Sequence, residues 1–126
     1  MTTHTLTLAA GMDWLNANHR IHWAAKAKRT RYWRDRARLE ARREGIPSLD
    51  RAHITVTIHK TRGGRYDPAN LAPTAKAIVD GLVDAGVLDD DDATRVIGPD
   101  MRAGEKRDVR QLVVTIEELP AEEKSA

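Results

Sequence analysis

The sequence contains no cysteine, which excludes a disulfide framework and thiolate metal ligands. Any metal site must therefore use oxygen or histidine ligands. No stretch approaches the roughly 20 consecutive apolar residues that a transmembrane helix needs. The N-terminal stretch MTTHTLTLAA also lacks the basic segment that opens a secretory signal. We therefore expect a soluble intracellular protein that does not bind membranes.

The chain has 126 residues, of which 40% are hydrophobic. A chain of this length and composition can form one hydrophobic core but is too short for two well-packed cores. We expect a single domain over residues 1–119, followed by an acidic, disordered tail over 120–126. The formal net charge of +2, among 32% charged residues, says little until the charges are located.

Alternating apolar and polar residues predict strands at 3–9 and 53–59, and a shorter strand at 94–98 precedes a final one at 111–119. Apolar residues at helical spacing predict a helix over 73–86. A second helix is expected in the later half of 11–45, after a polar loop, and a basic loop in 99–110. This order favours an α/β (α+β) fold in which two main helices pack on a small mixed β-sheet.

The predicted first helix is strongly basic. Nine lysines and arginines lie between Lys26 and Arg43, with Trp23 and Trp33 interleaved and only three acidic residues nearby. Such a helix suits a phosphate backbone, although it could equally be a solvated helix whose tryptophans reach the core. A second basic cluster in 99–110 favours binding. The expected DNA contacts are Lys26, Lys28, Arg29, Arg31, Arg34, Arg65, Asn70, Arg102, Lys106 and Arg107.

Four consecutive aspartates, Asp89 to Asp92, precede the predicted short strand. Their mutual repulsion would be relieved by a divalent cation, and Mg²⁺ prefers oxygen ligands and commonly takes one or two protein carboxylates beside a substrate phosphate. The alternative is a solvated connector in which Asp92 only caps a turn.

A wider pattern includes this run. Asp67, Asn70, Lys76 and Asp80, then Leu82, Gly86, the aspartates and Val96, follow an amino-terminal loop LNANHRIHW. Together they resemble the RusA family of Holliday junction resolvases, mostly phage and prophage enzymes, and the resemblance covers nearly the whole chain. Ala69 stands where the family has its second loop aspartate, and the longer segment LAPTA separates Asn70 from Lys76.

The resemblance implies a RusA-like fold and a crossover junction endodeoxyribonuclease that uses Mg²⁺ or Mn²⁺. Asp67, Lys76, Asp91 and Asp92 would be catalytic, and Asp67 would hold metal together with Asp90, Asp91 and Asp92. Asp80 is a weaker candidate because its position four residues after Lys76 suits an ordinary helical ion pair.

The same resemblance implies a homodimer that makes paired symmetric incisions in a four-way DNA junction. It also implies a cytoplasmic protein of a bacterial cell, encoded by a phage or prophage. Two alternatives remain open: a branched-DNA-binding protein of the same fold with impaired catalysis, and a basic interaction protein whose aspartates are merely solvated. The nuclease interpretation requires Asp67 to converge with the carboxylates that precede the strand at 94–98.

The histidines carry a weaker expectation. His53 and His59 flank a predicted strand and are expected at its surface or edge. His19 and His22 lie three residues apart near the basic helix and could touch DNA. None of these forms a convincing metal-binding pair.

Overall fold

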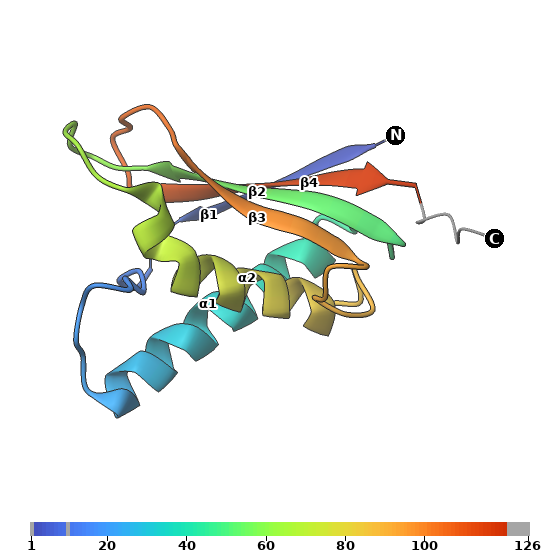
Figure 1. Cartoon of the computed structure of the whole chain (residues 1–126), viewed down its shortest axis with the longest axis horizontal. Helices are drawn as coiled ribbons and strands as arrows, with labels where there is room; N and C mark the ends of the chain where they lie inside the picture. The colour runs from blue at the N-terminus through green and yellow to red at the C-terminus, as the bar shows by residue number, and fades with distance from the viewer. Residues whose placement is uncertain (1, 10, 121–126) are drawn as a thin grey trace.

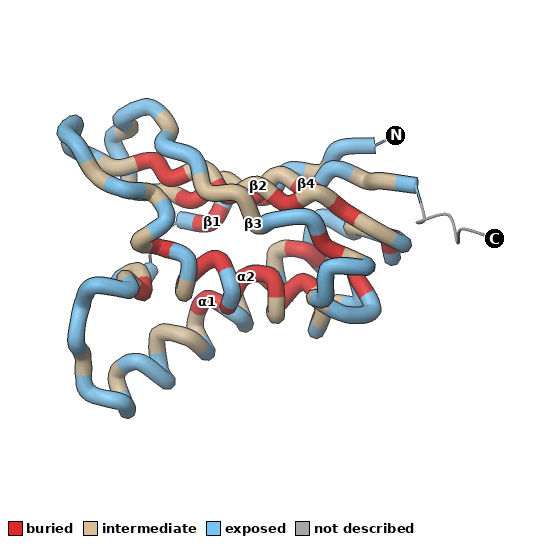
Figure 2. The backbone as a smooth tube through the Cα atoms, viewed as in Figure 1, coloured by how far each residue is buried: buried red, intermediate tan, exposed pale blue. Residues whose placement is uncertain are grey.

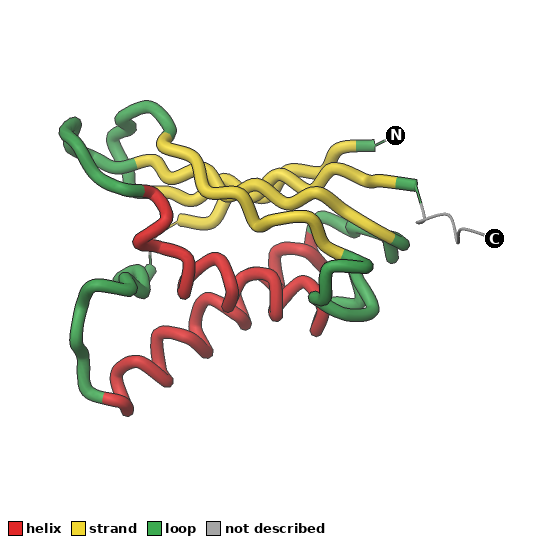
Figure 3. The backbone as a smooth tube through the Cα atoms, viewed as in Figure 1, coloured by secondary structure: helices red, strands yellow, loops and turns green. Residues whose placement is uncertain are grey.

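A four-stranded mixed sheet carries both long helices on one of its faces in the computed structural model of the protein (Figure 1, Figure 3). The structure describes residues 2–9 and 11–120, so the predicted disorder of the tail falls, from residue 121 onward, outside the described residues. The predicted α+β class is confirmed. The elements in chain order are β1 (Thr3–Ala9), α1 (Trp23–Arg43), β2 (Arg51–His59), the short 3₁₀ helix η1 (Pro68–Leu71), α2 (Ala72–Asp84), β3 (Val96–Ala103) and β4 (Gln111–Leu119).

The strands are ordered β1-β4-β2-β3, so β4 and β2 are central and β1 and β3 are the edges. β4 runs antiparallel to both β1 and β2, whereas β2 and β3 are parallel. A parallel pair needs a long crossover, and η1 with α2 supplies it. This crossover brings the Asp67–Lys76 segment and the aspartate run to the helix-covered side of β3.

The core lies between the sheet and the helices, where the buried positions of both layers face each other (Figure 2). Strand alternation turns Leu6 and Leu8 of β1 inward and leaves the intervening threonine exposed. Helix α1 buries only Trp33, Ala37 and Ala41, and it packs chiefly against α2. The small interface residues allow close packing: a Cβ added at Gly81 of α2 would lie 2.9 Å from the Ala37 Cβ.

The strand predicted at 94–98 is in fact β3 (Val96–Ala103), so residues 99–103 are not part of the basic loop that we expected. The cause is non-local: β2 offers an open edge, and Asp100 and Arg102 take up register opposite Thr55 and Thr57. Arg102 therefore projects from a strand. Within the described part of the chain, no helix is both long and apolar enough to cross a membrane.

Candidate functional site

Asp67 opens the segment that carries the resemblance. Its Oδ1 accepts a hydrogen bond from Ala69 N at 3.0 Å, which makes Asp67 the N-cap of η1, and Pro68 follows at the first helical position. Its carbonyl accepts from Asn70 N at 3.0 Å. Asp67 and Asp100 line a shallow hollow of about 420 Å³.

The amino-terminal loop is fastened to this segment. Ala17 N donates to the Asn70 carbonyl at 2.8 Å, so Asn70 fixes the loop through its backbone. Leu15 N donates to Thr74 Oγ1, and that hydroxyl is also within 2.8 Å of the Leu15 carbonyl. The asparagine-containing loop and the start of α2, which are more than fifty residues apart, are therefore neighbours in space.

Lys76 of α2 reaches two carboxylates. Its Nζ donates to Asp80 Oδ1 at 2.9 Å and also to Asp91 Oδ2, across the gap between α2 and the loop ahead of β3. The hydrogen bond that Lys76 donates to Asp91, and after it the one to Asp80, raise the pKa of Lys76, and the ammonium lowers the pKa of Asp91. Near neutral pH Lys76 is thus protonated and Asp91 ionised.

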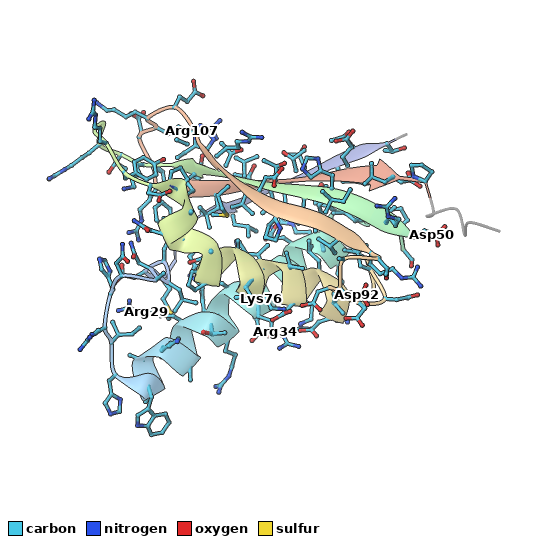
Figure 4. The ribbon with its side chains drawn as sticks, viewed as in Figure 1. Arg29, Arg34, Asp50, Lys76, Asp92 and Arg107 are labelled. Atoms are coloured by element: carbon cyan, nitrogen blue, oxygen red, sulfur yellow. The ribbon has the colours of Figure 1, made fainter. Side chains whose placement is uncertain are left out.

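The four aspartates have separate local roles. Asp89 lies 3.8 Å from Arg95, and Asp90 Oδ1 accepts from the Asp91 backbone N at 2.7 Å. Asp92 caps the turn into β3, because its Oδ1 accepts from Thr94 N at 2.8 Å and from the Thr94 hydroxyl. These bonds lower the pKa of Asp92. Only Asp91 of the run contacts Lys76 (Figure 4 labels Lys76 and Asp92 on the helix side of the sheet).

These carboxylates are the candidate ligands for a divalent metal ion. Among residues 2–9 and 11–120, no three or more Asp, Glu or His side chains gather as a group able to hold a metal ion. Asp67 therefore does not form such a group with the carboxylates ahead of β3, the convergence on which the nuclease interpretation depends, and the ligand set Asp67, Asp90, Asp91 and Asp92 stays a prediction. Asp80 and Asp91, however, already share one cation, the Lys76 ammonium. Two carboxylates fit the mode in which Mg²⁺ takes one or two protein ligands and keeps several waters.

The positive charge of α1 is partly neutralised by a carboxylate of α2 at the surface. Arg34 forks onto Asp84 of α2, with Nε at 2.6 Å from Oδ2 and a terminal nitrogen at 2.8 Å from Oδ1. This bidentate pair raises the pKa of Arg34 and lowers that of Asp84. Sequence inspection missed Asp84 as a partner because it belongs to another element. Arg34 is thus engaged, whereas Lys26, Lys28 and Arg31 are exposed.

Of the other predicted DNA contacts, Arg65, Lys106 and Arg107 lie in the loops after β2 and β3, and Arg102 lies on β3 itself. Arg65 is exposed in the loop after β2, Arg102 is exposed on β3, and Lys106 is exposed beyond it. Arg107 is partly tied down, since its Nη1 lies 3.1 Å from Gln111 Oε1 and its backbone N donates to the Lys60 carbonyl at 2.9 Å. Lys26, Arg31 and Arg34 line one hollow and Arg102 lines another, but Arg29 faces a concave surface where four positive side chains gather.

That surface, which we call the basic hollow, was not recognised from the sequence. It has a volume of about 530 Å³ and lies between the amino-terminal loop, α1 and the loops that follow β2 and precede β4. The sequence shows no local pattern for this hollow, because its charged residues are separated by up to about a hundred positions. They are Asp13, Arg29, Lys60, Arg62 and Arg110, and His19 also lines the hollow.

Two histidines differ from the expectation of a surface or edge position. His59 ends the central strand β2 and is buried, with Nδ1 at 2.9 Å from the Glu105 carbonyl, because the loop after β3 folds over it. His53 is half-buried on β2, and its Nε2 lies 2.6 Å from Asp100. His22 caps α1, where its Nδ1 accepts from Ala24 N at 3.2 Å.

No family model and no curated protein matches this sequence.

Proposed function

We propose that this chain is a metal-dependent, structure-selective endonuclease that resembles RusA-type resolvases and cuts paired strands of a four-way DNA junction. The observation that carries the proposal is the Lys76–Asp91 contact. It joins two parts of the pattern that suggested the family, α2 and the aspartate run, at one exposed place on the surface.

The proposed chemistry is phosphodiester hydrolysis. Asp80 and Asp91, rather than the full predicted set with Asp67, would hold Mg²⁺ or Mn²⁺, which would supply Lewis-acid activation of the scissile phosphate and of a water. Lys76, whose ammonium lies beside both carboxylates, would stabilise negative charge on a phosphate oxygen. Asp92 and Thr94 hold the turn that presents Asp91. Asp67, as the cap of η1, positions the segment that precedes Lys76.

The proposal includes a homodimer, since a four-way junction has approximate two-fold symmetry and needs two opposed cuts. Each protomer would then contribute one Lys76–Asp91 centre and one basic helix. The expected location, the cytoplasm of a bacterial cell that carries a phage or prophage, belongs to the same proposal.

Cleavage of a synthetic four-way junction, with linear duplex for comparison, tests the proposal. Symmetric nicks should appear only in the junction and only with Mg²⁺ or Mn²⁺. Asp91→Asn should lower the cleavage rate at least about a hundredfold, by loss of a ligand. The matched control is Asp89→Asn, which removes the same charge from the same run but faces Arg95. Equal rates for these two variants would contradict the assignment.

A second candidate function is junction binding without cleavage. It is favoured by Ala69 in place of a family aspartate and by the absence, within 2–9 and 11–120, of a three-residue acidic or histidine group able to hold metal. It predicts salt-sensitive junction binding and no product under any divalent metal. Nicking by the purified protein that is abolished in Asp91→Asn would exclude it.

A further inference from the structure

We propose that the basic hollow is a binding site for a backbone phosphate of a DNA strand, separate from the Lys76–Asp91 centre. The inference takes its ligand from the proposed function, but it does not depend on cleavage. Four positive side chains, Arg29, Lys60, Arg62 and Arg110, face a single carboxylate there. They come from α1 and two separate loops, so the fold, rather than a local run, concentrates the charge.

Asp13 shows that the hollow suits an oxyanion. Its Oδ1 lies 3.5 Å from Arg110 and its Oδ2 lies 3.6 Å from Arg29, so each carboxylate oxygen meets a different guanidinium. Guanidinium forks match phosphate oxygens as well as carboxylate oxygens. The Asp13 side chain is 66% exposed, so a phosphate can take its place without opening the core.

The cations are held in position by neighbouring rings. The Arg110 guanidinium packs over Trp14 at 4.8 Å from the ring centroid, and Lys60 Nζ lies 3.7 Å from the centroid of Tyr66. These contacts limit the freedom of two long side chains before any ligand arrives. Ordering costs on binding are lowered accordingly.

The hollow continues toward the proposed reaction centre. A second hollow of about 410 Å³ shares Asn16, His19 and Arg29 with the first and extends to Pro73 in the first turn of α2. Lys76 follows three residues later, and residues at this spacing lie on the same side of a helix. A strand held in the basic hollow therefore leads along one side of the molecule toward Lys76.

The first test measures binding of a fluorescent four-way junction by anisotropy in EDTA, so that no cleavage occurs. Arg110→Gln should weaken binding about tenfold and reduce the slope of log affinity against log salt by about one. The matched control is Arg43→Gln, at the other end of α1 and 78% exposed, which should stay within about twofold. Equal losses in both variants would overturn the site.

The second test predicts tighter, rather than weaker, junction binding. Asp13→Asn removes the competing carboxylate and should tighten junction binding about threefold, because the guanidinium groups lose an internal partner. Asp50→Asn is the charge-matched control, at the opposite end of the molecule from Arg29 (Figure 4). If Asp13→Asn binds the junction no more tightly than Asp50→Asn, the proposal is contradicted.

If Arg110→Gln unfolds the protein, the exposed Arg62→Gln replaces it in the first test, with the same expected loss of affinity.

These outcomes separate the two proposals. A protein that never cuts DNA but shows the Arg110 effect in EDTA retains the phosphate site and loses the nuclease assignment. A protein that cuts junctions but binds them equally well after Arg110→Gln retains the nuclease assignment and loses the phosphate site. Excess inorganic phosphate, compared with chloride at equal ionic strength, should compete with junction binding in wild type and much less in Arg110→Gln.

Discussion

Leu15 and Thr74 are joined by a two-way contact: Leu15 N donates to Thr74 Oγ1 at 2.8 Å, and the same hydroxyl donates to the Leu15 carbonyl at 2.8 Å. Both residues are buried. One hydroxyl therefore satisfies a donor and an acceptor of the amino-terminal loop, and the loop that forms one wall of the basic hollow depends on this contact.

Thr74→Val keeps the shape of the side chain but removes the hydroxyl. Two buried backbone groups of Leu15 lose their partner, so the free energy of unfolding should fall by about 1–3 kcal/mol. Urea denaturation of the purified variant measures this. The control is Thr57→Val, the same change on the sheet face away from the helices, which should cost less than about 0.5 kcal/mol. Similar losses at both positions would show that the bridge adds nothing.

The two tryptophans of α1 should behave oppositely. Trp33 is fully buried and its Nε1 donates to the Asp13 carbonyl at 3.0 Å, whereas Trp23 is 76% exposed. Trp33→Ala should lower the free energy of unfolding by about 3–5 kcal/mol through cavity formation, and Trp23→Ala should change it by less than about 0.5 kcal/mol. Chemical denaturation compares the pair, and a large loss in Trp23→Ala would place that ring in an interface or core.

The Arg34–Asp84 pair should make stability depend on acid. Arg34 lowers the pKa of Asp84 in the folded state, so the pair stabilises the protein above the unfolded pKa, near 4, and the stabilisation is lost as pH falls through the lower folded pKa. At pH 7, Asp84→Asn should reduce the free energy of unfolding by about 0.5–1 kcal/mol, since the pair is partly exposed.

As the pH falls through the lowered pKa of Asp84 in the folded protein, that difference should shrink, because wild-type Asp84 also becomes neutral. Urea denaturation at neutral and acidic pH measures the change, with Asp50→Asn as an exposed carboxylate control. A deficit in Asp84→Asn that stays constant across this range would mean that the loss comes from packing and not from the ion pair.

The elements with strong local periodicity were predictable. β4 occupies the predicted residues 111–119, and β1 the predicted 3–9, because side chains that alternate in sequence must also alternate between the two faces of a strand. The helix of Ala72–Asp84 likewise follows from apolar residues at helical spacing after a proline. The extra length of β3 was not predictable, since only pairing with β2 supports it.

The candidate site also contains contacts that the sequence could predict and contacts that it could not. Asp92 as a turn cap and Lys76 with Asp80 are contacts within four residues, and the sequence indicated both. The Lys76–Asp91, Arg34–Asp84 and Asp13–Arg110 contacts join segments that only the fold brings together.

Short-range periodicity and composition were enough to predict the class of fold, the positions of most strands and helices, and the presence of separate basic and acidic segments. Which charges neutralise one another, and which remain exposed at a concave surface, followed only from the fold. Electrostatic interactions depend on distance in space, and those distances are set by the crossover between β2 and β3 and by the fastening of the amino-terminal loop.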